Sequence, residues 1–180
     1  MDSMHPAALD DETLLLQCRI TRSRSGGPGG QNRNKVETHV TIHHEPSGLS
    51  AQAGERRSQL ENKQMALRRL RLELAVEVRT VPPRLKGKAL LDALDKPEGS
   101  ALWLSRLSGG KIVCNPNHHD FPALLAELMD YLADSNFEPG ATGRRLGVTT
   151  SQIIKFLKEH PPALLALNRE RGRKGLHGLK

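Results

Sequence analysis

The sequence predicts an α+β fold: a small antiparallel sheet covered by one helix, followed by a mainly helical second half. Apolar and polar residues alternate over residues 14–24 and again over 38–44, which is the period of a strand. Over residues 57–78, Leu recurs at intervals of three, four and seven, which is the period of one helix face. A sheet with one apolar face needs such a helix to cover it.

The expected sheet has strands over residues 14–24, 38–44 and 49–53. The segment Glu45-Pro46-Ser47-Gly48 separates the last two strands, and its Pro and Gly are typical of a tight turn, so these strands should form a hairpin. Residues 1–12 show neither period, and we expect a flexible N-terminus or a short cap there.

The segment between the first two expected strands contains Gly26-Gly27-Pro28-Gly29-Gly30-Gln31. Glycine lets a backbone approach a ligand closely, so this loop is suited to presenting main-chain amides and one glutamine to something large. Residues 17–36 contain no Asp or Glu, and we interpret the loop as addressing RNA. The positive charges of this stretch are Arg19, Arg22, Arg24, Arg33 and Lys35.

The spacing of the residues in the glycine loop tests two other interpretations. A phosphate-binding P-loop needs Lys and a hydroxyl where Gln31-Asn32 stands, and a dinucleotide fingerprint needs Gly in place of Asn32. Both are therefore excluded. A mobile linker between two elements remains open at this point.

The second half of the chain has shorter apolar segments, which begin after Pro82-Pro83 ends the long helix. In order, we expect a short helix over residues 87–94, a hairpin from 102–107 and 111–114, a loop over 115–120, and helices over 121–133 and 163–171.

Residues 138–160 have the pattern of a helix-turn-helix, with Gly147 in the turn and Thr149 or Thr150 as the cap of the second helix. This segment either binds nucleic acid or is a plain corner between two packed helices. Its candidate RNA-binding residues are Arg144, Arg145, Lys155 and Lys158.

Charge is distributed unevenly along the chain. The net charge is +7, and the whole excess lies in residues 141–180, since Lys and Arg balance Asp and Glu before them. A basic block of this kind favours phosphate binding, and it adds Arg171, Arg173 and Lys174 to the candidates. We expect domains over residues 13–80 and 84–165, and a basic tail over 166–180.

Several classes of protein are excluded by composition. Two Cys are too few for a disulfide framework, no apolar run approaches a membrane span, and the acidic N-terminus is unlike a signal peptide. We therefore expect a soluble, cytoplasmic protein. The lone Trp103 should be a core residue.

Two histidine clusters, His43-His44 and His118-His119-Asp120, raise the question of a metal. Adjacent residues of a strand point to opposite faces, so each pair would offer one ligand at most. Neither cluster has the spacing of a zinc motif. We expect no metal and no cofactor.

Residues 24–72 resemble the catalytic domain of class I bacterial and organellar peptide chain release factors. The motifs that carry the resemblance occur in the family's order: Ser25 to Gln31, Asn34-Lys35, Pro46-Ser47-Gly48-Leu49, Arg57-Ser58-Gln59 and Asn62-Lys63. The resemblance implies a ribosome-dependent hydrolase that cleaves the ester of peptidyl-tRNA.

The resemblance also implies roles for single residues. The backbone N–H of Gln31 would stabilise charge on the carbonyl oxygen, its side chain would shape the water site, and Gly29 and Gly30 would allow that geometry. The chain departs from many relatives, which have His-Val where Asn32-Arg33 stands. Further candidate RNA contacts on the matching segments are Ser25, Arg33, Asn34, Lys35, Arg57, Gln59 and Lys63.

Decoding members of the family carry a separate domain that reads the stop codon, and nothing in this sequence matches it. The resemblance is therefore closer to short, codon-independent members that rescue stalled ribosomes, some of which have a basic tail. Its implied partners are the ribosome with its rRNA and peptidyl-transferase centre, peptidyl-tRNA, and a methyltransferase acting on Gln31. We expect a monomer.

Two questions remain open on the sequence alone. The substrate is either an intact stalled ribosome or a split large subunit that carries peptidyl-tRNA. The alternative function is a non-enzymatic nucleic-acid-binding protein that uses the helix-turn-helix. The change Gln31→Ala separates the two functions, because only the hydrolase depends on that residue.

Overall fold

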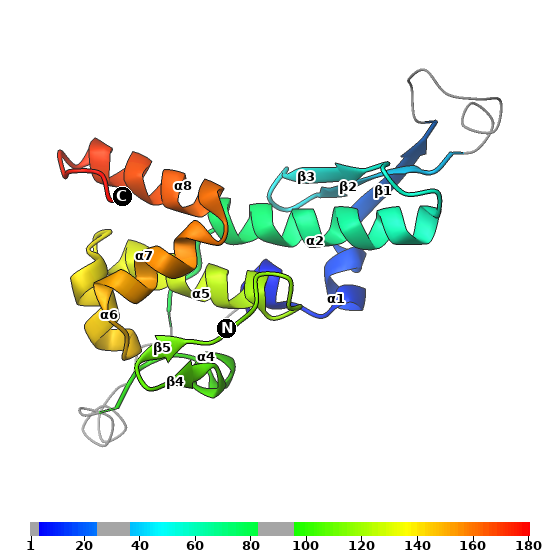
Figure 1. The fold of residues 1–180 in the computed structure, drawn as a ribbon. Helices are drawn as coiled ribbons and strands as arrows, with labels where there is room; N and C mark the ends of the chain where they lie inside the picture. Colours follow the sequence, from blue (N-terminus) through cyan, green and yellow to red (C-terminus); the bar gives the residue numbers. More distant parts are fainter. Residues whose placement is uncertain (1–3, 25–36, 83–95) are drawn as a thin grey trace. The chain divides into compact units, whose positions relative to one another are not determined.

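The computed structural model describes residues 4–24, 37–82 and 96–180, which have an α+β fold (Figure 1). One compact unit spans Pro6–Leu74, and a second spans Ala75–Lys180 together with the start of the chain. Each unit is described by itself below. Among the described residues, no helix combines the length and the apolar character that crossing a membrane requires.

The chain enters the first unit through a 3-10 helix, η1 (Pro6–Ala8), and helix α1 (Asp11–Leu16). Asp10 caps α1, because its side chain accepts the N–H of Thr13 at 2.9 Å. The predicted strand over residues 14–24 therefore begins only at Cys18, because residues 14–16 belong to α1. Residues two apart share one face in a strand but lie on different sides of a helix. In α1, Leu14 is therefore buried while Leu16 is 87% exposed.

The sheet of the first unit consists of β1 (Cys18–Ser23), β2 (His39–His44) and β3 (Ser50–Ala53), antiparallel in that order. The strands predicted over residues 38–44 and 49–53 are confirmed. Val40 and Ile42 of β2 are buried while the residues between them are less so, as the alternation predicted. The hairpin turn has Gly48 at φ +71°, a conformation that favours glycine.

Helix α2 (Gln59–Glu77) covers this sheet, close to the predicted range of 57–78 (Figure 1). Its leucines at 67, 70 and 74 are buried, as the spacing predicted. Leu60, the first member of the predicted stripe, is instead 65% exposed. In the first turn of α2, the buried position is occupied by Asn62.

The described residues of the second unit are mainly helical and include a two-stranded hairpin. Its elements are α4 (Ala101–Ser105), β4 (Leu107–Ser108), β5 (Lys111–Ile112), α5 (Phe121–Asp134), α6 (Pro139–Leu146), α7 (Thr150–Lys158) and α8 (Pro161–Arg173). Most residues of α5 are buried, which makes it the central helix of this core. The helix predicted over residues 87–94 lies outside the described residues.

The predicted hairpin of residues 102–114 is only partly confirmed, because its first arm is mostly helix α4. Ser100 caps α4 by accepting the N–H of Trp103 at 3.0 Å. Trp103 is buried, as predicted, and its indole N–H donates to the carbonyl of Leu146 at 3.1 Å. The cap and this buried anchor favour a helix over the strand suggested by the local pattern.

The C-terminal segment after α8 folds back on that helix. The amide of Asn168 bonds twice with the backbone of Leu179, donating to its carbonyl at 2.9 Å and accepting from its N–H at 2.7 Å. Arg171 donates to the carbonyl of His177 at 3.0 Å. The residues of the predicted basic tail, 166–180, thus comprise the end of α8 and this returning segment.

Candidate catalytic loop and nucleic-acid interface

The predicted catalytic residues Gly29, Gly30 and Gln31 lie outside the described residues, and the structure describes the stem that carries them. Their neighbours among the predicted RNA contacts, Ser25, Arg33, Asn34 and Lys35, also lie outside. Strand β1 ends at Ser23, which pairs with His39 at the start of β2. The chain therefore leaves the sheet and returns to it at one end of the ladder (Figure 1).

The two strands of the stem are joined by side chains as well as by the ladder. The hydroxyl of Ser23 lies 3.1 Å from Nδ1 of His39. Gly54 makes room for this ring, because a Cβ at that position would lie 2.4 Å from Cδ2 of His39. A side chain at position 54 would displace the ring that closes the stem.

Asn62 fixes the returning strand of the stem to helix α2. Its buried side chain donates to the carbonyls of Thr38 at 2.7 Å and of Arg56 at 2.9 Å, and it accepts the N–H of Arg56 at 2.9 Å. A buried amide with these partners holds the two backbone segments at a set separation. In the sequence, Asn62 belongs to the Asn62-Lys63 motif, and a polar residue at a core position of the helix is the signal for this structural role.

Gln59 supports the same stem and is bonded within the chain. Its Nε2 donates to the carbonyl of Glu37 at 2.8 Å, one residue before the carbonyl that Asn62 holds. One amide hydrogen of Gln59 thus has a partner within the chain, and the expected contact of Gln59 with RNA stays a prediction.

The remaining predicted RNA contacts of the first unit surround this stem. Arg22, Arg24 and Arg57 are exposed, and Lys63 is partly exposed. None of the four forms an ion pair within the described parts of the chain, whereas Arg69 of α2 pairs with Glu55 at 2.6 Å. These four cations therefore remain available to a polyanion.

In the second unit, α6 and α7 form the predicted helix-turn-helix. Gly147 ends α6 in the left-handed conformation at φ +71°, and Thr149 caps α7 by accepting the N–H of Gln152 at 3.3 Å. Gly143 lets the turn approach α6, since a Cβ there would lie 2.3 Å from the carbonyl oxygen of Val148. The corner is thus closely packed, with little freedom between its helices.

Two of the predicted cations of this unit hold the fold together instead. Arg145 bonds to Glu98 at 2.8 Å and to Asp134 at 2.6 Å, and it stacks on the ring of Tyr131. The bonds to Glu98 above all raise the pKa of Arg145. Arg171 is buried and donates to the carbonyl of Phe137 at 2.7 Å. Both guanidinium groups therefore have partners within the fold, and their expected contact with RNA stays a prediction.

The other predicted cations of the second unit fall into two groups. Arg144, Lys155 and Lys158 are exposed and form no ion pair with any residue that the structure describes. Arg173 pairs with Glu170 at 2.7 Å, and Lys174 donates to the side-chain oxygen of Asn136 at 3.1 Å. The available cations therefore include those at the helix-turn-helix.

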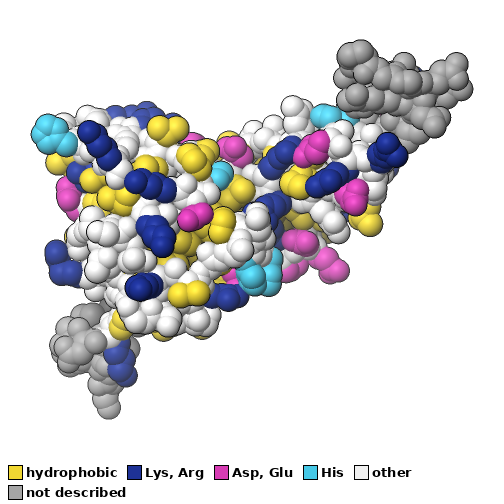
Figure 2. Space-filling view, in the orientation of Figure 1, with side chains coloured by type: hydrophobic (Ala, Val, Ile, Leu, Met, Phe, Trp, Pro, Cys, Tyr) yellow, Lys and Arg dark blue, Asp and Glu magenta, His cyan; other side chains and the backbone are white. Residues whose placement is uncertain are grey.

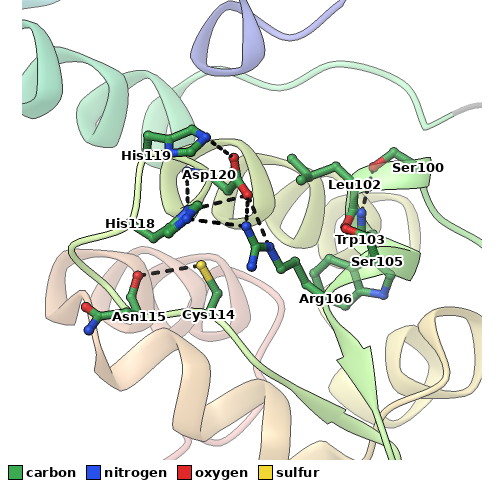
Figure 3. Close-up of polar contacts among 10 residues, drawn as sticks. All are labelled: Ser100, Leu102, Trp103, Ser105, Arg106, Cys114, Asn115, His118, His119 and Asp120. Carbon is green, nitrogen blue, oxygen red and sulfur yellow. Dashed lines mark hydrogen bonds and ion pairs between the residues drawn. The ribbon is translucent and has the colours of Figure 1, made fainter.

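The cluster His118-His119-Asp120 lies in a turn before α5, so the argument from strand geometry does not apply to it (Figure 3). Asp120 receives the guanidinium of Arg106 and lies 2.9 Å from Nε2 of His119. Burial raises the pKa of this carboxyl, but its bond to Arg106 and the two imidazoles lower it on balance. Because Arg106 already neutralises Asp120, we assign no metal to this cluster.

Comparison with known proteins addresses the first unit. Residues 14–89 match the family model of the RF-1 domain. The chain is 57% identical over 66 residues to peptide chain release factor 1 of Chlorobaculum tepidum, covering 37% of this chain and 18% of that protein. It is 54% identical over 57 residues to peptide chain release factor PrfB1, chloroplastic, of Arabidopsis thaliana, covering 32% and 12% of the two chains.

A third relative, peptide chain release factor 2 of Mycobacterium tuberculosis, is 39% identical over 85 residues, or 47% of this chain and 21% of that protein. The chain thus spans about a fifth or less of the length of these relatives. The matched segment contains the glycine loop, its stem and the covering helix. Residues 14–89 are therefore similar to the RF-1 domain, and the similarity to the peptide chain release factors covers this part of the chain.

Proposed function

We propose that the chain hydrolyses the ester bond of peptidyl-tRNA on the ribosome, with Gly29, Gly30 and Gln31 as its catalytic loop. The observation that carries this proposal is the RF-1 match over residues 14–89, because it includes the loop together with the stem that presents it. The stem is held by Asn62, and exposed arginines flank it.

The chemistry follows from the bond that is cut. Water attacks the ester carbonyl, negative charge develops on its oxygen, and the ribose hydroxyl leaves. A backbone N–H aimed at that oxygen stabilises the transition state, and one donor of this kind contributes about 3 kcal/mol. In this proposal the N–H of Gln31 is the donor, and its side chain positions the water. Flanking glycines let the main chain approach the ester.

RNA would hold the loop in place through the cations around the stem. Arg22, Arg24, Arg57 and Lys63 have no ion-pair partner among the described residues, so they can bind phosphates without breaking an internal pair. The proposal also includes Ser25, Arg33, Asn34 and Lys35, which lie outside the described residues, as RNA contacts. Binding of this kind should weaken steeply with salt.

A finer part of the proposal is that release needs no stop codon. It is supported by the resemblance to short rescue proteins, in which cationic C-terminal segments bind rRNA, and by the exposed cations of the second unit. The named relatives are release factors 1 and 2, so this part needs its own test. The proposal also includes action as a cytoplasmic monomer and methylation of Gln31, which mass spectrometry of native protein can show.

The test is a release assay with labelled peptidyl-tRNA on ribosomes that carry a stop codon, a sense codon or no codon in the A site. We expect comparable release in all three states and a large loss for Gln31→Ala. The matched control is Gln52→Ala, an exposed glutamine of β3. Release only with a stop codon would overturn the rescue assignment. Full release by Gln31→Ala would overturn the role of Gln31, and ribosome binding by the wild type without release would favour the non-enzymatic alternative.

A further inference from the structure

Helix α7 presents one polar, cationic side to solvent. Ser151, Lys155 and Lys158 are exposed, and their spacing of four and three residues places them on one side of the helix. The opposite side, with Ile153, Phe156 and Leu157, is buried in the core of the second unit. We call this exposed side, together with Thr150 and with Arg144 near the end of α6, the α7 surface.

The α7 surface has the charge of a polyanion-binding site. Its three cations form no ion pair among the residues described, in contrast to Arg145, which is bound by two carboxylates. One exposed carboxylate, Glu159, follows at the C-terminal end of α7. Figure 2 shows Lys and Arg side chains gathered over the region of the second unit that contains α6, α7 and α8.

The corner behind this surface is stiff, which suits a binding element. Gly143 and the left-handed Gly147 allow a close approach of the turn, and Thr149 caps α7. A helix held in this way loses little conformational entropy on binding. In a helix-turn-helix the second helix is the one that meets nucleic acid, and here that helix is α7.

We propose that the α7 surface binds the phosphate backbone of folded RNA. The proposal rests on the proposed function for the kind of RNA. It deepens that function because it names the surface of the second unit that would hold the chain on the ribosome. The other candidate anchor, the C-terminal segment, is bonded back onto α8 through Asn168.

The side chains of the α7 surface indicate backbone contact more than base reading. The side chains best suited to reading bases are Arg, Asn and Gln, which make paired bonds to base edges. On this surface they are Arg144 and the partly exposed Gln152, whereas the exposed residues of α7 itself are mainly hydroxyls and lysines, which are typical phosphate contacts. A protein helix does not fit the narrow major groove of A-form RNA, so α7 would lie along the backbone.

The direct test is binding of the full-length chain to a fluorescent RNA stem-loop of about 20 base pairs, measured by anisotropy. The test variant is Lys155→Gln with Lys158→Gln. The matched control, Lys96→Gln with Lys180→Gln, removes the same charge from exposed lysines of the same unit. Lys155→Arg with Lys158→Arg keeps the charge and should bind like the wild type.

Two lost phosphate contacts should reduce the slope of log affinity against log salt by about 1.5. This corresponds to an affinity about 30-fold lower near 0.1 M salt. Adding Arg144→Gln should lower the affinity further, by about the same factor as each single lysine contact. The control pair should stay near the wild type. Equal loss in both pairs would overturn the proposal, since net charge alone would then explain binding, and so would tighter binding to a B-form DNA duplex of the same sequence.

The same variants separate this inference from the proposed function. Lys155→Gln with Lys158→Gln should raise the protein concentration that gives half-maximal peptide release by about the factor by which it lowers RNA affinity. Failure of the proposed function would appear differently, as RNA binding by the wild type without release. A lower release rate at saturation for the α7 variant, with unchanged RNA affinity, would contradict the binding role.

Discussion

Replacing Asn62 by Ala should detach the returning strand of the loop stem from helix α2. The side chain is buried and makes three hydrogen bonds, to the carbonyls of Thr38 and Arg56 and to the N–H of Arg56. Each bond contributes about 1 kcal/mol net, and backbone groups left buried without partners add to the cost. We expect the free energy of unfolding to fall by about 3 kcal/mol.

Urea denaturation of the full-length chain, followed by circular dichroism, measures this loss. Gln59→Ala is the control, because it removes a single hydrogen bond, to Glu37, that is more exposed than those of Asn62. This change should cost about 1 kcal/mol or less. Asn62→Asp keeps an acceptor for Arg56 but places a carboxylate against two carbonyls, so it should be no better than Ala. A change within about 0.5 kcal/mol for Asn62→Ala would refute the assigned role.

Three further perturbations test other parts of the structure. Gly143→Ala should cost about 1–3 kcal/mol and lower the melting temperature, because its Cβ would collide with the carbonyl of Val148; a neutral change would show that the corner can open. Arg145→Ala should cost about 1–2 kcal/mol in urea denaturation, more than Arg144→Ala, because it leaves two partly buried carboxylates unpaired. Burial lowers the pKa of His44, so the unfolded chain binds its proton more readily. The stability that His44 contributes should be present above its ordinary pKa and lost as pH falls through the lowered value. The free energy of unfolding, measured at neutral and at acidic pH, should therefore change less with pH in His44→Gln than in the wild type.

The sheet and its helix could be predicted because their periods are set by burial. Val40 and Ile42 alternate with polar residues, and the leucines at 67, 70 and 74 follow the buried face of α2. The two helices that the pattern missed, α1 and α4, are short, and a capping side chain and one buried residue decide each of them. Periodicity over five or six residues carries too little information to separate helix from strand there.

Some features of the candidate site could also be predicted from the sequence, and others could not. The glycine loop and the helix-turn-helix could be recognised, because their glycines and cap residues are local signals. The roles of Asn62 and Arg145 could not, since their partners lie 24 and 47 residues away along the chain. A cation in a basic segment looks the same in the sequence whether it contacts RNA or, like Arg171, lies buried against backbone carbonyls.

The most direct test of the central claim is the single-turnover rate of peptidyl-tRNA hydrolysis at saturating protein, compared between Gln31→Ala and Gln31→Pro, which both lack the glutamine side chain. Proline removes the backbone N–H that we assign as donor. We predict a rate about 100- to 1000-fold lower for Gln31→Pro with unchanged affinity for ribosomes, which is the effect of losing one oxyanion donor. Equal rates for the two proteins would contradict the account.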